Sequence, residues 1–358
     1  LHEQVQGFGF VTPDDKKMAK DIFIAKENSM GAVTGHKVVV EMTDYGNERR
    51  SPEGKVIEIL GHIHDPGVDI LSVIRRYELA VEFPAEVYQE IEDVETEVSE
   101  EEIAGREDLR DVLTITIDGE DAKDLDDAVS LSVLPNGNYE LGVHIADVSH
   151  YVREHTALDK EAYARGTSVY LVDRVIPMLP HKLSNGICSL NPHTDRLTLS
   201  CIMEIDRRGQ VLAHQVVNSV IHSDYRMTYT AVQDLLDGKT PALREQYAQI
   251  LPMLEEMNTL RTILWERRKK RGSVHFDLPE AKIKLDEMGK PIEILPYERN
   301  DATNLIEEFM LICNETIAEN YFWQEIPFVF RSHQEPDEEK MEKMEQFLNL
   351  EQQKTSIW

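Results

Sequence analysis

An acidic segment between two strand-like segments constrains this sequence more than any other feature. From Asp118 to Asp127, six of ten residues are carboxylates, and Lys123 is the only fixed positive charge among them. Two carboxylates held about 4 Å apart repel each other by roughly 4 kcal/mol at an effective dielectric near 20. A fold that gathers several of them needs a bound cation, and hard oxygen ligands favour Mg²⁺ or Mn²⁺.

The residues around the acids predict how they are brought together. Residues 113–118 alternate apolar and polar side chains and predict a strand that ends at Asp118, after which Gly119 permits a turn. Residues 128–133 predict a second strand leading away. The loop between them would place Asp124 and Asp126 on one face and aim Asp127 in another direction. Such a spread of carboxylates suits one or two metal ions.

Two other interpretations of the acidic segment are less favourable. Solvated loops are usually built from Gly, Ser, Asn and Pro, whereas this one carries apolar Leu125 and lies tightly between two apolar strands. A calcium-binding EF-hand loop requires Gly at its sixth position and Glu at its twelfth. Counted from Asp124, those positions hold Val129 and Pro135, so the EF-hand interpretation fails.

Composition sets further limits. With 358 residues, 41% of them hydrophobic, the chain is long enough for two or three globular domains. No apolar run approaches twenty residues and no signal peptide is evident, which predicts neither a membrane span nor export. Three scattered cysteines, Cys188, Cys201 and Cys313, are typical of a reducing cytoplasm. We therefore expect a cytoplasmic protein.

The charge balance argues against a nucleic-acid partner. Against 38 basic residues stand 67 acidic ones, for a net charge of −29. A nucleic-acid-binding protein is expected to carry a basic face. Basic residues do cluster at 75–76 and 267–271, so a local groove can still be positive. The second cluster is equally consistent with a basic helix end that complements the helix dipole.

Six segments, in order, resemble the ribonuclease II and ribonuclease R family of exoribonucleases, and the ribonuclease R branch most. They are residues 116–129, 144–149, 165–170, 175–180, 183–186 and 188–192. The resemblance implies a metal-dependent, processive 3′-to-5′ exoribonuclease that hydrolyses single-stranded RNA to nucleoside 5′-monophosphates, with a role in RNA degradation and quality control. A non-catalytic RNA-binding protein with a structural cation site is the alternative.

The resemblance also implies roles for individual residues. Four aspartates would be the catalytic ligands of Mg²⁺, with Mn²⁺ possible: Asp118, Asp124, Asp126 and Asp127. Asp126 is the one most tied to chemistry. Tyr170 would pack against the 3′-terminal base, Phe276 would close the stack of bases at its far end, and Glu308 would face the pocket. On pattern alone, Tyr170 is a half-buried strand residue and Phe276 a core residue. Glu308 shares a helix face with Asn300 and Asn304, for which a solvated stripe is the alternative.

The first sixty residues resemble a cold-shock-type OB domain. The matching segments are residues 7–11, 21–24 and 37–41. In that family, aromatic side chains on adjacent strands stack on bases. The corresponding residues here are Phe8, Phe10 and Phe23, with Lys37 near the RNA backbone. Filling the core of the small barrel is the alternative role for the three rings.

These patterns predict an α+β protein in three parts. Residues 1–62 would form the cold-shock-type OB β-barrel with an incomplete first strand, and 63–110 a helical connector with helices at 68–79 and 84–91. Residues 111–358 would form the amino-terminal part of a mixed α/β catalytic domain of the RNB type, with a hairpin turn at 134–139. Long helices are expected at 243–271, interrupted or started by Pro252, and at 301–322. The resemblance implies truncation at both ends, without the family's Thr-Ser-Pro-Ile-Arg motif. We therefore expect the 358-residue chain to be nearly inactive, and the full-length protein to be a monomer.

One further group of polar residues suggests a site at first sight. His144, Asp147 and His150 lie close together in sequence. If the segment is a strand, both histidines face away from Asp147, which breaks up a metal site or catalytic triad. We therefore interpret the three as packing residues.

Overall fold

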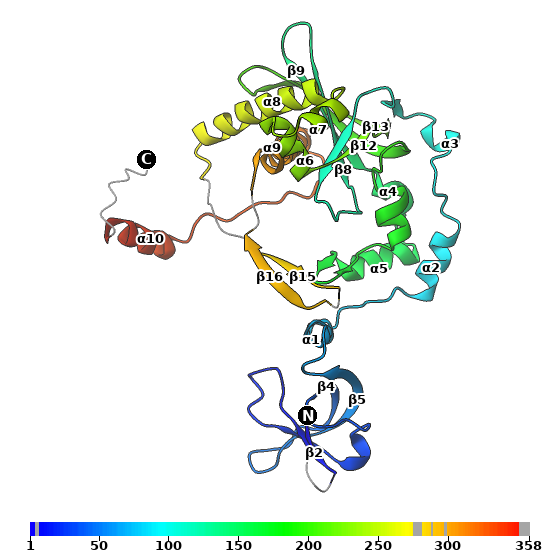
Figure 1. The fold of residues 1–358 in the computed structure, drawn as a ribbon, viewed down its shortest axis with the longest axis vertical. Coiled ribbons are helices and arrows are strands. Elements are labelled where there is room, and N and C mark those ends of the chain that lie inside the picture. Colours follow the sequence, from blue (N-terminus) through cyan, green and yellow to red (C-terminus); the bar gives the residue numbers. More distant parts are fainter. Residues whose placement is uncertain (4–6, 275–280, 288, 297–298, 351–358) are drawn as a thin grey trace. The chain divides into compact units, whose positions relative to one another are not determined.

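The computed structural model describes residues 1–3, 7–274, 281–287, 289–296 and 299–350. Residues 1–309 form one compact unit and residues 310–358 a second (Figure 1). Phe276 lies outside the described residues, so its predicted role stays a prediction. None of the helices in the described ranges is long and apolar enough to cross a membrane.

The amino-terminal strands form a small barrel. Its five-stranded sheet has the order β1-β2-β3-β5-β4. The strands are β1 (His2–Glu3), β2 (Gly9–Val11), β3 (Ile22–Ile24), β4 (His36–Asp44) and β5 (Glu53–His62), with a 3₁₀ turn, η1 (Lys26–Asn28). The core of the barrel is formed by Val11, Ile22, Ile24 and Val56. Gly54 lets two strands approach closely, because a Cβ there would lie 2.4 Å from Val40 Cγ1.

Helix α1 (Val68–Arg76) is joined to this barrel by polar contacts. Arg75 donates from Nε and Nη2 to the Glu58 carboxylate at 2.6 and 2.8 Å. Ser72 donates to Asp14 at 3.1 Å. The predicted helix at 68–79 is confirmed, although it ends earlier, at Arg76.

A seven-stranded mixed sheet forms the centre of the larger domain. Its order is β14-β7-β8-β9-β12-β13-β6. The strands are β6 (Glu107–Asp108), β7 (Ile115–Asp118), β8 (Asp127–Val133), β9 (Tyr139–Ala146), β12 (Asp195–Ile205), β13 (Val211–His222) and β14 (Tyr225–Thr228). The β14/β7 and β13/β6 pairs are parallel and the others antiparallel. The predicted strands on both sides of the acidic loop are therefore confirmed as β7 and β8.

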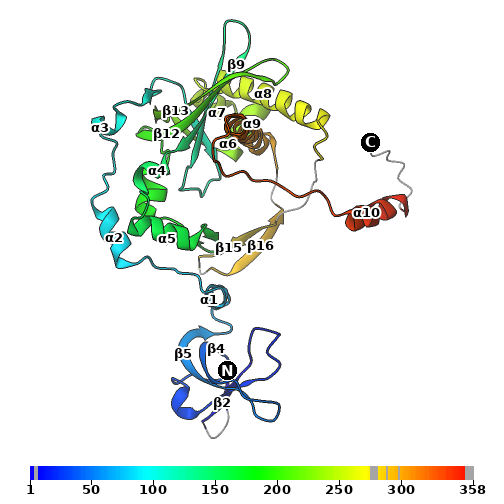
Figure 2. The ribbon, with the colours of Figure 1, turned by 180° about the vertical axis from the view of Figure 1, so that it is seen from behind.

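Two helices, α6 (Tyr229–Asp237) and α8 (Leu251–Lys270), contact strands of this sheet, and the other helices and short hairpins are distributed along the rest of the chain (Figures 1 and 2). The remaining helices are α2 (Ala85–Glu92), α3 (Glu100–Ile103), α4 (Val148–Tyr151), α5 (Ala157–Arg165), α7 (Pro241–Gln246), α9 (Asp301–Trp323) and α10 (Glu338–Leu350). A π-helical turn, η2, spans Lys182–Ile187, and two hairpins are formed by β10 (Val169–Tyr170) with β11 (Val175–Ile176) and by β15 (Ala281–Leu285) with β16 (Pro291–Pro296).

The helical segment predicted at 243–271, interrupted or started by Pro252, is confirmed in that form. The chain forms two helices there, α7 and α8, and α8 begins with Pro252 in its first turn. Proline lacks an N–H donor and suits the start of a helix better than its interior. The predicted helix at 301–322 is confirmed as α9.

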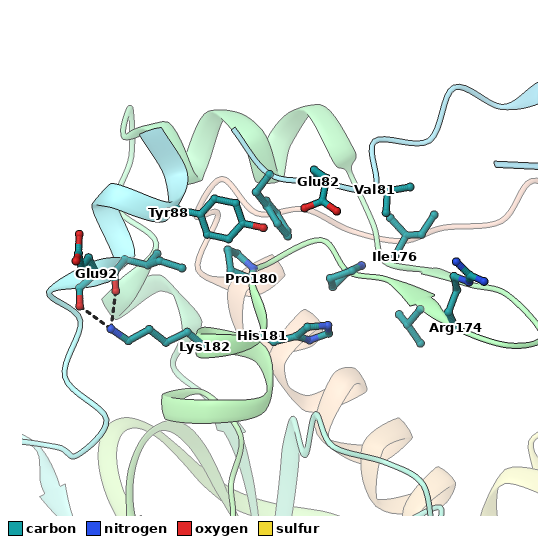
Figure 3. A pocket seen from close by; sticks show the side chains of 13 residues that line it. Val81, Glu82, Tyr88, Glu92, Arg174, Ile176, Pro180, His181 and Lys182 are labelled. Carbon is teal, nitrogen blue, oxygen red and sulfur yellow. Dashed lines mark hydrogen bonds between the residues drawn. The ribbon is translucent and has the colours of Figure 1, made fainter. Parts of the chain in front are cut away.

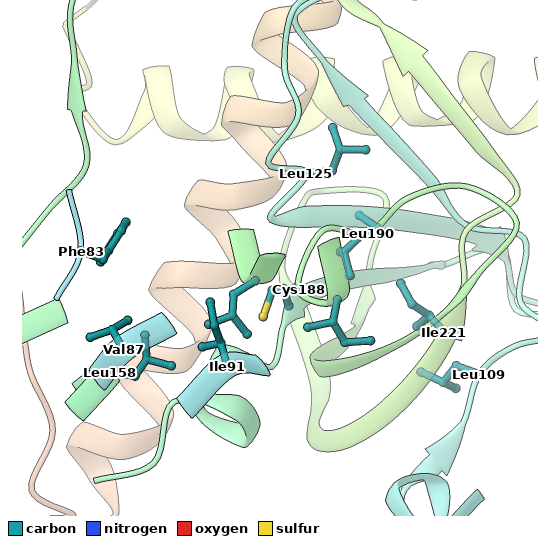
Figure 4. Close-up of a cluster of buried hydrophobic side chains, with 13 residues drawn as sticks. Phe83, Val87, Ile91, Leu109, Leu125, Leu158, Cys188, Leu190 and Ile221 are labelled. Atoms are coloured by element: carbon teal, nitrogen blue, oxygen red, sulfur yellow. The ribbon is translucent and has the colours of Figure 1, made fainter. Parts of the chain in front are cut away.

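A hydrophobic cluster joins helix α2 to the domain built on the seven-stranded sheet (Figure 4). Val87 and Ile91 on α2 pack with Leu158 on α5 and with Leu183 and Cys188 around η2. Burying a Val or Leu side chain contributes about 1.5 to 3 kcal/mol. Helix α2, predicted at 84–91 as part of a connector, is thus confirmed as a helix and packs into this core.

Candidate functional site

The acidic loop is held by one buried apolar side chain. Leu125 is fully buried in the hydrophobic cluster, while its acidic neighbours lie at the surface or half-buried. The Leu125 N–H donates to Ser189 Oγ at 3.1 Å, and Leu125 O accepts from the Leu190 N–H at 2.8 Å. Ser189 Oγ also donates to Lys123 O at 2.9 Å. Leu125 and Ser189 therefore fix the loop on its side facing the hydrophobic cluster and leave Asp124 and Asp126 outside the core.

Two strands fix the ends of the loop. Asp118 is the last residue of β7, and Asp127 is the first of β8. Asp127 lies opposite Ile145 on β9, and Asp126 O accepts from the Ala146 N–H at 3.0 Å. The backbone of these acids is therefore part of the rigid sheet.

Three carboxyl groups of the acidic loop have raised pKa values. Burial, followed by the charge of Asp127, raises the pKa of Asp118 to about 7, and only Arg226 acts against this shift. Partial burial, followed by Asp124 and Asp127, raises the pKa of Asp126. Burial also raises the pKa of Asp127. Asp118 Oδ2 is buried and has no hydrogen-bond partner in the described part of the chain. A buried acceptor of this kind is costly unless a ligand satisfies it.

The chemistry of these donors fits a hard divalent cation. They are carboxylate oxygens, one of them buried and unpartnered among the described residues, and burial raises the pKa of Asp118, Asp126 and Asp127, which a bound cation would oppose. Among the described residues, however, no three Asp, Glu, His or Cys side chains already converge as a metal site. A bound ion would have to draw the mutually repelling carboxylates together.

Tyr170 lies beside the acidic loop. It belongs to the β10/β11 hairpin, and its hydroxyl donates to Asp124 Oδ2 at 3.1 Å. Its side chain is 69% exposed, so the half-buried position expected from the pattern alone is wrong. The hydrogen bond holds the hydroxyl at the carboxylates and leaves much of the ring accessible.

A cavity lies behind this hairpin (Figure 3). It has a volume of about 560 Å³ and is lined by residues 81–83, 88, 91–92, 174–177 and 180–182. Lys182 Nζ closes one side by donating to Ile91 O and Glu92 O, both at 2.7 Å. Arg165 lies over the Phe83 ring at 3.7 Å and donates to Pro177 O at 3.0 Å. These contacts attach the segment after the hairpin to the connector, and none of the four candidate aspartates lines the cavity.

Glu308 is paired with an arginine. It is 3% exposed on α9, which rules out a solvated stripe. Arg268 Nε donates to its two oxygens at 3.0 and 3.3 Å. Glu308 and Asn304 line a common cavity of about 260 Å³, whereas Asn300 caps α9 by accepting the Thr303 N–H at 2.9 Å. Arg268, in the basic cluster 267–271, is thus already engaged.

Three phenylalanines gather on the barrel. Phe8, Phe10 and Phe23 have ring centroids 5.7 to 6.0 Å apart. All three are half-buried and lie outside the barrel core, because on β2 and β3 the core residues alternate with them. The core-filling alternative is therefore wrong. Lys37 Nζ forms an ion pair with Asp14 at 2.6 Å, and no contact in the described ranges joins it to the rings.

Asp147 and His150 do meet, contrary to the expectation from a strand. Asp147 caps α4 rather than continuing β9, so its carboxylate accepts the His150 N–H at 3.2 Å. Arg106 Nη2 donates to the same carboxylate at 2.7 Å. His144 is separate and fully buried between Ser130 and Ser200, at 3.0 and 2.6 Å, and burial lowers its pKa to about 4. Both histidines have packing partners, as expected.

Sequence reasoning missed Arg226. Its strand β14 pairs in parallel with β7, so that Arg226 lies opposite Thr116 and Thr228 opposite Asp118. Arg226 Nη2 donates to the carbonyl oxygens of Glu120 and Ala122 at 3.2 and 2.5 Å. No local motif marks this arginine, because its position depends on pairing between strands far apart in sequence.

Comparison with known proteins identifies the family. The RNB domain model matches residues 106–357, and the cold shock domain model matches residues 10–84, beyond the boundary expected at 62. The chain therefore belongs to the RNB-domain family. It is 48% identical to ribonuclease R of Thermotoga maritima over 344 residues, which cover 95% of this chain and 48% of that protein. The chain spans about half the length of the curated relatives it matches.

Solved structures agree on the fold. Mycoplasma genitalium RNase R in complex with double-stranded RNA matches with a TM-score of 0.85 and 27% identity, covering 92% of this chain and 58% of that one. Yeast Ssd1, described as a pseudonuclease, matches with a TM-score of 0.73 and 18% identity, covering 97% of this chain and 43% of that one. The second likeness concerns the fold alone. The expected α+β architecture, a cold-shock barrel followed by an RNB-type domain, is confirmed.

Proposed function

We propose that the protein containing this chain is a metal-dependent exoribonuclease that degrades single-stranded RNA processively from the 3′ end to nucleoside 5′-monophosphates. The observation that carries this proposal is the buried, unpartnered Asp118 Oδ2 at the strand end, among carboxylates with raised pKa values. Membership of the RNB-domain family supports it.

In this proposal Asp118, Asp124, Asp126 and Asp127 hold Mg²⁺, or Mn²⁺ in its place. Such an ion supplies a Lewis acid that polarises water and the scissile phosphate. The chain itself contributes the placement of the acids. The rigid ends of β7 and β8 and the buried anchor Leu125 fix the loop, so little reorganisation remains at the moment of reaction.

RNA would be bound mainly by stacking of its bases on aromatic rings. Stacking tolerates any base sequence, and it does not require the chain to carry a net positive charge. We assign stacking on the 3′-terminal base to Tyr170, whose hydroxyl lies 3.1 Å from Asp124 Oδ2 of the acidic loop. We assign stacking at the far end of the bound bases to Phe276. Glu308 would help to shape the pocket through Arg268. Phe8, Phe10 and Phe23 would stack on bases upstream, with Lys37 near the backbone.

We retain the proposed division into a barrel at 1–62, a connector at 63–110 and a catalytic part at 111–358. A monomer is proposed for the full-length protein. The three cysteines are buried thiols outside any disulfide of the described residues, which supports a reducing compartment such as the cytoplasm.

A degradation assay tests the proposal. Single-stranded RNA labelled at its 5′ end is incubated with Mg²⁺ or with EDTA, and released products are identified by mass. The assay compares the 358-residue chain with the longest natural polypeptide that contains this sequence. We expect little or no hydrolysis by the 358-residue chain, because it spans only about half the length of its relatives. Nucleoside 5′-monophosphates formed only with Mg²⁺ are expected. Internal cuts, or no products from the longer polypeptide, would overturn the proposal.

A second candidate is a non-catalytic RNA-binding protein with a structural cation. It is favoured by one observation, that the carboxylates in the described ranges do not already converge as a metal site. The same assay separates the two, since this candidate predicts RNA binding without products under all conditions.

A further inference from the structure

Arg226 is an exposed arginine beside the acidic loop, and within the described residues its guanidinium is held by backbone oxygens rather than by a carboxylate. Its Nη2 is held by two neutral carbonyls, those of Glu120 and Ala122. Nε and Nη1 make no hydrogen bond with any described residue, and no ion pair within 4.0 Å joins Arg226 to a described carboxylate. Three N–H donors of the guanidinium, one on Nε and two on Nη1, therefore have no partner among the described residues.

Several other arginines of this chain are paired with carboxylates. Arg106 pairs with Asp147 at 2.7 Å, and Arg165 pairs with Glu161 at 2.8 Å. Arg110 pairs with two carboxylates, at 2.6 and 3.1 Å. Arg226 lies close enough to Asp118 to oppose its charge, yet its hydrogen bonds go to backbone oxygens. Its guanidinium is thus held beside the acidic loop without a carboxylate partner among the described residues.

We propose that Arg226 has two tasks: Nη2 keeps the acidic loop closed, while Nε and Nη1 donate to a non-bridging phosphate oxygen of the RNA backbone bound at that loop. An RNA phosphate approaching several carboxylates is repelled, and a planar guanidinium offsets this repulsion with directed hydrogen bonds. This inference rests on the proposed function, because it takes RNA as the ligand of the site.

Binding without catalysis tests the inference. The dissociation constant for a short single-stranded RNA is measured in EDTA for the wild-type protein, Arg226→Gln and Arg226→Lys. Arg208→Gln is the matched control, because Arg208 is also exposed and pairs only with Asp206 in a hairpin turn. We expect Arg226→Gln to weaken binding about 10-fold and to lower the slope of affinity against salt by about 0.7, the value for one phosphate contact on a single strand. Arg208→Gln should change neither.

A neutral linkage locates the contact. Methylphosphonates, which lack one charged oxygen, replace the RNA phosphates one at a time from the 3′ end. On the RNA modified at the contacted linkage, Arg226→Gln should bind as well as the wild type. On RNAs modified at other linkages, Arg226→Gln should again bind about 10-fold more weakly than the wild type. Arg226→Lys keeps the charge and should retain most of the salt slope.

The outcomes are separable. An unchanged salt slope in Arg226→Gln, or an equal loss on every modified RNA, would mean that Arg226 only closes the loop and would overturn the inference. If Arg226→Gln does not fold by circular dichroism, Arg226→Lys decides by the methylphosphonate series. Because these measurements need no hydrolysis, a protein that binds RNA as described but never cleaves it would refute the proposed function and leave the phosphate contact standing.

Discussion

Asp118 ends one strand and Asp147 follows another strand of the same sheet, but their surroundings are opposite. Burial would raise the pKa of Asp147, yet hydrogen bonds from Arg106 and Ser149 and the charge of Arg106 lower it below its usual value. Asp118 has burial and neighbouring carboxylates, and its pKa rises to about 7. Asp147 is therefore satisfied within the fold, while Asp118 is left to be satisfied by something that binds.

This contrast distinguishes a structural carboxylate from a functional one. Removing a structural carboxylate should lower the stability of the protein, but the molecules that remain folded should keep their activity. A functional carboxylate should be tolerated by the fold, or even be unfavourable to it, and be essential for turnover.

The largest effect is expected for Asp126→Asn. The neutral amide removes charge from the proposed ion site, so hydrolysis should fall by at least about 1,000-fold in kcat. RNA affinity should stay within about 3-fold, since the proposed base-stacking contacts lie on aromatic rings. Asp121→Asn, an exposed acid of the same loop, is the control and should remain active. Near-normal turnover in Asp126→Asn would remove Asp126 from the proposed site.

The second test concerns the structural carboxylate, Asp147, and its partner Arg106. Arg106→Ala leaves Asp147 buried without its cation, which should lower the free energy of unfolding by about 3 kcal/mol. The two side chains are 11% and 7% exposed, so little water can replace the bond. Chemical denaturation measures the loss, with exposed Arg208→Ala as a control that should unfold like the wild type. A stable Arg106→Ala protein that has lost turnover would break the distinction between the two aspartates.

The pH dependence of stability should separate the aspartates by sign. Folded Asp118 keeps its proton up to about pH 7, whereas an unfolded aspartate releases it near 3.8. The folded state thus binds more protons between these values, and this group makes the free energy of unfolding fall as the pH rises from about 4 to 7. Asp147, with its lowered pKa, contributes stability that is present above about pH 4 and is lost on acidification.

Denaturation in EDTA at about pH 5 and about pH 7.5 measures this difference. Relative to wild type, Asp118→Asn should be more stable at the higher pH by about 1 to 2 kcal/mol, allowing for solvent screening, and by less at the lower pH. Mg²⁺ at the higher pH should stabilise the wild type more than the variant. If Asp118→Asn is less stable than wild type at both pH values, Asp118 is a structural residue like Asp147.

Much of the acidic site could be predicted from sequence because it is local. The strand, turn and strand around Asp118 and Asp127 are determined by adjacent residues, and apolar Leu125 argued against a solvated loop. Likewise, Pro84 as a helix start predicted α2, and the apolar residues along 301–322 predicted α9.

The parts that were missed are long-range. Arg106 and Asp147 are 41 residues apart, and Arg268 and Glu308 are 40 apart. Arg226 reaches the acidic loop only because β14 pairs with β7. A single sequence does not say which of many arginines meets which acid, since that choice is made by strand pairing and helix packing. For this reason Glu308 could be predicted to lie on a helix face but not to be paired with Arg268.

The smallest effect concerns Tyr170 and extends the comparison to Asp124. If the Tyr170 hydroxyl did for Asp124 what Arg106 does for Asp147, Tyr170→Phe would be as harmful as Tyr170→Ala. We expect the opposite, because Tyr170 is 69% exposed and its proposed task is stacking. Tyr170→Ala should weaken binding of short RNA about 10-fold and lengthen the final product, since stacking contributes about 1 to 3 kcal/mol per base. Tyr170→Phe keeps the ring and should change affinity by less than about 3-fold. Gel analysis of the limit product and titration with short RNAs measure both; equal damage in the two variants would show that the hydrogen bond to Asp124, rather than the ring, is what the site requires.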